Sequence, residues 1–107
     1  MGKDFPLLWK VYDHIVAHPK EWDQYTFVET THCGTTFCFA GHAVMMARPD
    51  VTVEDDRFLD RNGDEVCPEM EARRLLGLTD KEAHRLFYTF TSDPTELRDI
   101  ILDWASA

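Results

Sequence analysis

The sequence predicts a mainly α (α+β) fold, a single compact domain of about five helices with one small β-hairpin. The seventeen residues from Thr31 to Ala47 carry no Lys, Arg, Asp or Glu, although 29% of the chain is charged, as expected of a buried element. Apolar residues elsewhere recur at helical spacing between capping residues, and one β-rich stretch contains an Asn-Gly turn. With 107 residues and 44% hydrophobic residues, the chain fits one domain over residues 1–107.

The first helix is predicted from Asp4 to Ala17. Asp4 is a suitable N-cap, Pro6 fits the first turn, and Pro19 ends the helix near His18. An apolar stripe at helical spacing needs a covering element, and it consists of Leu8, Val11, Tyr12 and Ile15.

The segment from Lys20 to Glu29 is too aromatic for an exposed linker. We expect an irregular or one-turn segment in which Trp22 and Phe27 pack against the central element. That element is predicted to be a helix from Phe37 to Ala47, capped by Thr35 or Thr36.

The central helix is apolar all round, so it must be surrounded on most sides. Gly41 in its interior indicates that another backbone or an indole ring passes close by. Phe39, Ala43 and Val44 are predicted core residues, and a charge at position 43 should unfold the domain.

Beyond the central helix the pattern becomes β-rich from Val51 to Cys67. Asn62-Gly63 is the strongest short signal for a tight hairpin turn. The sequence therefore predicts one hairpin, with residues 57–61 on the first strand and Val66 and Cys67 on the return strand.

Three more helices are predicted toward the C-terminus. Pro68 opens the first, and Gly77 ends it as a C-cap. Thr79 and Glu82 form a capping box for the second. The third is capped by residues 93–96 and carries the apolar residues Leu97, Ile100, Ile101 and Trp104.

The net charge is −9, and the stretch from Asp50 to Arg74 holds nine acids against four bases. No cluster of Lys and Arg is present to bind phosphates, so nucleic acid and anionic membranes are poor partners. We expect a non-enzymatic module that binds a basic protein surface through an acidic face around Asp50 to Glu71. The predicted partner-binding residues are Asp55, Asp56, Asp60 and Asp64.

No apolar run is long enough to cross a membrane, and the N-terminus does not resemble a secretory signal. A cytoplasmic protein with reduced thiols, monomeric or weakly homodimeric, is therefore expected. The sequence predicts no catalytic residues and no cofactor.

The alternative is a small zinc- or thiol-dependent protein that uses Cys33, Cys38 and His42, with His32 or Cys67 as a fourth ligand. Cys38 could equally be a small buried hydrophobic residue. A second pair, His14 and His18, is spaced four apart on one helix face. It could bind a metal or simply be exposed near a helix C-terminus.

Four motifs are spread along the chain: Trp22-Asp23-Gln24, Cys33-Gly34-Thr35-x-x-Cys38-x-Ala40-Gly41-x-Ala43, the hairpin turn, and Leu75-Leu76-Gly77-Leu78-Thr79-x-x-Glu82-Ala83-x-x-Leu86-Phe87. With these motifs the chain resembles a family of uncharacterised small proteins encoded by actinobacteria and their bacteriophages. The resemblance implies a phage or prophage origin, a bacterial host cell, no established activity and, by analogy, a host protein as partner. Members often have Trp at the position of His42, which favours a packing role for this residue.

Overall fold

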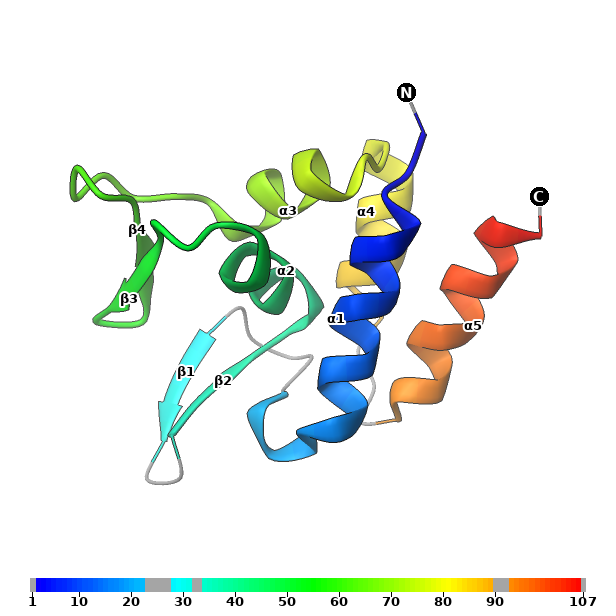
Figure 1. The fold of residues 1–107 in the computed structure, drawn as a ribbon, viewed down its shortest axis with the longest axis horizontal. Helices are drawn as coiled ribbons and strands as arrows, with labels where there is room; N and C mark the ends of the chain where they lie inside the picture. Colours follow the sequence, from blue (N-terminus) through cyan, green and yellow to red (C-terminus); the bar gives the residue numbers. More distant parts are fainter. Residues whose placement is uncertain (1, 23–27, 32–33, 90–92, 107) are drawn as a thin grey trace.

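Helices dominate the computed structural model, which describes residues 2–22, 28–31, 34–89 and 93–106. Its described residues form five α-helices, one 3-10 helix and two two-stranded antiparallel sheets (Figure 1). The predicted mainly α fold is confirmed, with one hairpin more than expected. The elements are α1 (Phe5–Ala17), η1 (Pro19–Glu21), β1 (Val28–Thr31), β2 (Gly34–Phe37), α2 (Phe39–Ala47), β3 (Thr52–Glu54), β4 (Arg57–Leu59), α3 (Pro68–Leu76), α4 (Asp80–Phe87) and α5 (Pro94–Ala105).

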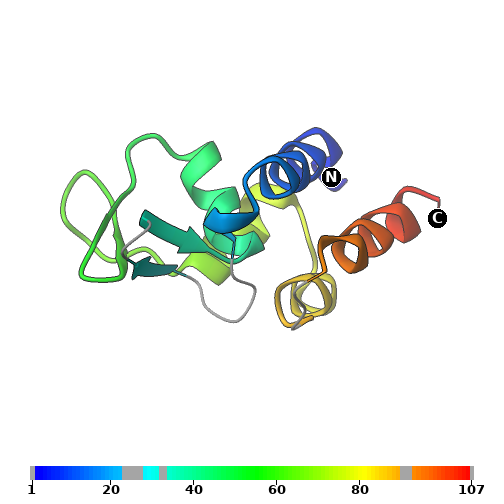
Figure 2. The ribbon, with the colours of Figure 1, turned by 90° about the horizontal axis from the view of Figure 1, so that it is seen from below.

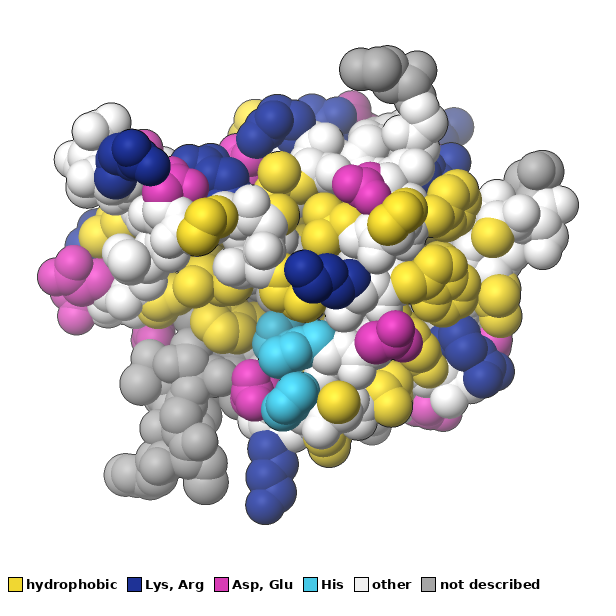
Figure 3. Space-filling model, viewed as in Figure 1, with side chains coloured by type: hydrophobic (Ala, Val, Ile, Leu, Met, Phe, Trp, Pro, Cys, Tyr) yellow, Lys and Arg dark blue, Asp and Glu magenta, His cyan; other side chains and the backbone are white. Residues whose placement is uncertain are grey.

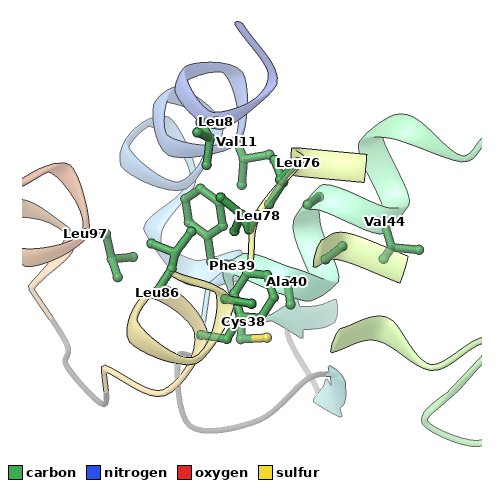
Figure 4. Close-up of a cluster of buried hydrophobic side chains, with 14 of the residues drawn as sticks. Leu8, Val11, Cys38, Phe39, Ala40, Val44, Leu76, Leu78, Leu86 and Leu97 are labelled. Carbon is green, nitrogen blue, oxygen red and sulfur yellow. The ribbon is translucent and has the colours of Figure 1, made fainter. Parts of the chain in front are cut away.

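Helix α2 lies at the centre of the fold, as its apolar sequence predicts. It packs against α1, α3 and α4, and the side chains of Phe39, Ala43 and Val44 are fully buried. Phe39 lies among side chains that come from the other four helices (Figure 4). Gly41 is buried within α2, and Trp22 packs against the core as expected, whereas Phe27 lies outside the described residues.

Helices α1 and α5 and the β3–β4 hairpin occupy opposite ends of the molecule. Helix α1 contacts α2, α3 and α5, so its apolar stripe is covered from several sides. In Figures 1 and 2, α1 and α5 lie at one end and β3 and β4 at the other. The β3–β4 hairpin is joined to the core through the buried Phe58, while its turn at Asp55 and Asp56 is exposed.

The start of the central helix differs from the prediction. Residues 34–37 form β2, paired with β1 in the register Val28↔Phe37 and Thr31↔Gly34, and Cys38 is the N-cap of α2. Neither Thr35 nor Thr36 caps the helix, because both lie in an extended strand whose backbone groups bond to β1. The helix therefore begins two residues later than expected.

The hairpin also differs from the prediction. Strands β3 and β4 pair across Asp55 and Asp56, whose φ angles of 52° and 59° define a type I′ turn. Gly63 does form a turn, with φ 82°, but the chain returns only through one bridge, Leu59↔Glu65. Cys67 is the N-cap of α3 instead of a strand residue, because Pro68 starts that helix immediately afterwards.

The predicted end of α3 is confirmed. Gly77 has φ 70° and ends α3, where the Leu78 N–H donates to Arg73 O at 3.0 Å, as in a Schellman motif. The N-terminal segment crosses this turn: the Asp4 N–H donates to Leu76 O at 2.8 Å. A Cβ on Gly77 would come within 2.6 Å of Gly2 O.

Removal of the α4 cap should weaken the fold. The Thr79 hydroxyl accepts from the Glu82 N–H at 3.2 Å, and the Glu82 carboxylate accepts from the Thr79 N–H at 2.9 Å. Thr79→Ala should lower the free energy of unfolding by about 1 kcal/mol, measured by urea denaturation. Thr79→Ser retains the hydroxyl acceptor, so an equal loss in this control would contradict a capping role.

Candidate functional site

The predicted partner-binding acids lie on a projecting element that we call the acidic arm, residues 54–64. Asp55 and Asp56 form the tip of the β3–β4 hairpin and are exposed. Acidic side chains lie at the end of the molecule where this hairpin lies, with Lys and Arg side chains beside them (Figure 3). Aspartate tolerates left-handed backbone angles better than most residues, so the tip combines negative charge with a defined turn.

Asp60 and Asp64 have different roles in the arm. The Asp60 carboxylate accepts hydrogen bonds from the Asn62 N–H at 2.8 Å and the Asp64 N–H at 3.0 Å. It therefore stabilises the turn around Gly63 as an Asx-type cap. Asp64 is exposed at the end of that turn. Of the four predicted acids, Asp60 is thus partly structural, while the other three are on the surface.

The rest of the predicted acidic face is largely paired with arginines. Arg48 binds the Asp50 carboxylate through two hydrogen bonds, of 3.0 and 2.6 Å, which holds the pKa of Asp50 below its usual value. Arg48 also lies 3.5 Å from Glu71, which pairs with Arg74 as well. The acidic surface is therefore narrower than the span from Asp50 to Glu71 and is centred on the arm.

The predicted zinc ligands are only partly within the described residues. Cys38 is buried at the N-terminus of α2, and His42 lies one turn later, buried to 3% exposure. Cys33 lies outside the described residues, and Cys67 is an exposed thiol at the start of α3. Among the described residues, Cys38 and His42 do not belong to a group of three ligands.

His42 makes a specific buried contact. Its Nε2 lies 2.8 Å from Glu21 O, and because a carbonyl oxygen can only accept, Nε2 carries the proton. Burial lowers the pKa of His42 to about 4, and the hydrogen bond to the Glu21 backbone opposes this only in part. His42 is therefore a neutral core residue at pH 7 that fixes the position of η1.

Three ligating side chains come together at the end of α1. His14, His18 and Glu21, which we call the histidine–glutamate cluster, offer ligand atoms that all lie within 4.8 Å of one another. The sequence leaves open whether the two histidines bind a metal, and it gives no indication of Glu21. The available signal was Pro19, which ends α1 after His18 and starts the 3-10 turn that brings Glu21 back toward His14.

Comparisons with known proteins add no relative: no family model, no curated protein and no solved structure matches the chain. Within the described ranges, no helix has the length and apolar character required to span a membrane. The fold and these residues define a small, acidic, mainly helical domain with a projecting acidic arm and a surface histidine–glutamate cluster.

Proposed function

We propose that the protein is a non-enzymatic binding module whose acidic arm docks on a basic surface of a partner protein. The observation that carries the proposal is the placement of Asp55 and Asp56, exposed at the tip of a hairpin whose base is fixed to the core by the buried Phe58. The arm holds five acids, Glu54, Asp55, Asp56, Asp60 and Asp64, against two bases, Arg57 and Arg61.

The backbone of the arm supports recognition by charge. The type I′ turn and the Asp60 cap hold the arm in one conformation, so little conformational entropy is lost when it binds. Opposite charges steer the encounter and raise the association rate, most strongly at low salt. The expected partner surface is rich in Lys and Arg.

The kind of partner rests on the sequence alone. The resemblance to actinobacteriophage proteins favours a host protein in the bacterial cytoplasm as the partner. A monomer or a weak homodimer would leave the arm available to it. No catalytic or cofactor-dependent step is part of the proposal.

Charge neutralisation on the arm tests the proposal. Asp55→Asn, Asp56→Asn and Asp64→Asn together should slow association with a captured host protein about tenfold at low salt. Asparagine is chosen because it tolerates the positive φ angles at the tip, and Asp60 is kept because it caps the turn. Surface-based kinetics at two salt concentrations provide the measurement.

The control makes the same change in charge elsewhere: Asp13→Asn, Asp99→Asn and Asp103→Asn on the exposed faces of α1 and α5. This control should retain most of the association rate. Equal losses in both variants would attribute the effect to net charge, and binding that is unchanged by the arm substitutions and by high salt would refute the proposal.

A further inference from the structure

We propose that His14, His18 and Glu21 form a binding site for a divalent transition-metal ion of the zinc class. The site is separate from the acidic arm and includes neither Cys38 nor Cys67. Two imidazoles and one carboxylate make a donor set typical of zinc sites that leave a position open to water or to an external ligand. Histidine side chains lie together beside an acidic one on the face shown in Figure 3.

The distances in the cluster already approach those of a metal site. Ligand atoms about 2.0–2.1 Å from a tetrahedral zinc ion lie about 3.3 Å from one another. His14 Nε2 and Glu21 Oε1 are 3.3 Å apart, and the rings of His14 and His18 stack with centroids 4.3 Å apart. Rotation of exposed side chains would therefore be enough to close the site, without a change in the backbone.

A hydrogen bond to the backbone sets the tautomer of His18 within the cluster. His18 Nδ1 lies 3.1 Å from His14 O and must carry the proton, because the carbonyl oxygen can only accept. This leaves the lone pair of His18 on Nε2. Metal-ligating histidines commonly donate their second ring nitrogen to a backbone carbonyl in this way, which fixes both tautomer and ring orientation.

A second contact holds the glutamate. The buried His42 donates Nε2–H to Glu21 O at 2.8 Å and places its ring 5.2 Å from the ring of His14. Both the turn that carries Glu21 and the helix that carries His14 are thereby anchored to the core. Anchoring from a buried side chain distinguishes this cluster from a chance group of surface residues.

The electrostatic setting fits a divalent cation with an open coordination position. The side chains of His14 and Glu21 are 30% and 48% exposed, so an ion can enter from solvent. The Glu21 carboxylate already lies 3.3 Å from His14 Nε2, and a metal ion would take the place of a proton shared between these two groups. The charge of one carboxylate offsets half of the charge of the ion.

Titration of the chelator-treated protein with Zn²⁺ alone tests the site. Isothermal calorimetry should show one ion bound per chain. His18→Gln or Glu21→Gln should raise the dissociation constant for zinc at least about tenfold. Long-range ¹H–¹⁵N spectra of the unaltered protein should show zinc-dependent shifts of the ring nitrogens of His14 and His18. This second readout does not depend on any variant.

His84→Gln is the matched control, because His84 is an exposed histidine on α4 outside the cluster. It should bind zinc as the unaltered protein does. Absence of stoichiometric zinc binding, or equal binding by His18→Gln, Glu21→Gln and the unaltered protein, would overturn the proposal. Loss of zinc in Cys33→Ser with retention in His18→Gln would also overturn it and assign the metal to the cysteine residues.

Discussion

Ala43→Asp should strongly destabilise the fold. Ala43 lies in the middle of α2 with no exposed surface, between helices that cover α2 from several directions. An aspartate there would bury either an unpaired charge or an unsatisfied carboxyl group, at a cost of about 3–5 kcal/mol. A domain of this size has a total stability of about 5–15 kcal/mol, so a large part of it would be lost.

Thermal melting followed by circular dichroism measures this effect. We expect either no cooperative transition or a midpoint lowered by at least about 15 °C. Ala105→Asp makes the same change at an exposed position of α5 and should cost less than about 1 kcal/mol. Ala43→Val adds volume without charge and should leave a folded, weakened protein. An unchanged midpoint for Ala43→Asp would mean that α2 is not the centre of the core.

The stability of the metal-free protein should fall as the pH drops from about 6.5 toward 4, because of His42. In the unfolded chain this imidazole takes up a proton near its ordinary pKa of 6.5, whereas in the folded protein burial lowers the pKa to about 4. Between the two values the unfolded state binds more protons, so acid favours unfolding. The full contribution is about 3 kcal/mol, of which about 2 kcal/mol is lost between about pH 7 and pH 5.

His42→Gln isolates this contribution from the many carboxylates that titrate in the same window. Glutamine can still donate an N–H to Glu21 O but does not ionise. The charged or titratable groups that face His42 are His14, His18 and Glu21, and the variant keeps all of them. Urea denaturation with chelator present should show a shallower pH dependence for the variant. Parallel curves for the two proteins would contradict a neutral, buried His42.

Much of the helical part could be predicted because its signals are local. The Thr79 capping box and the glycine at position 77 act through hydrogen bonds that span only a few residues. The apolar stripe of α1 follows from a fixed helical period. Such features depend little on the rest of the chain, and the structure confirms them.

The strands could not be predicted in the same way. The charge-free segment from Thr31 to Ala47 contains the end of β1, all of β2 and the whole of α2, and low charge is common to buried strands and buried helices. The pairing of β2 with β1 decides where the helix begins. In the second hairpin, Asn62-Gly63 is a stronger sequence signal for a turn than Asp55-Asp56, where the strands actually turn. Pro68 follows Asn62-Gly63 too closely for a full return strand to form.

The candidate sites depend still more on the three-dimensional arrangement. Glu21 joins His14 only because the chain turns sharply at Pro19, and the contact between His42 and Glu21 O links residues 21 positions apart. The double role of Asp60, as an acid and as a turn cap, depends on backbone angles that composition does not reveal.

The contact between α1 and α5 has a consequence for the order in which the chain can fold on the ribosome. Helix α1 is made before α5, which contacts it in the folded domain. Until α5 has emerged, this contact cannot form, so the side of α1 that α5 covers stays exposed. The nascent chain therefore carries a partly exposed apolar helix until α5 is made, a surface that chaperones recognise, and the domain can close only after that point.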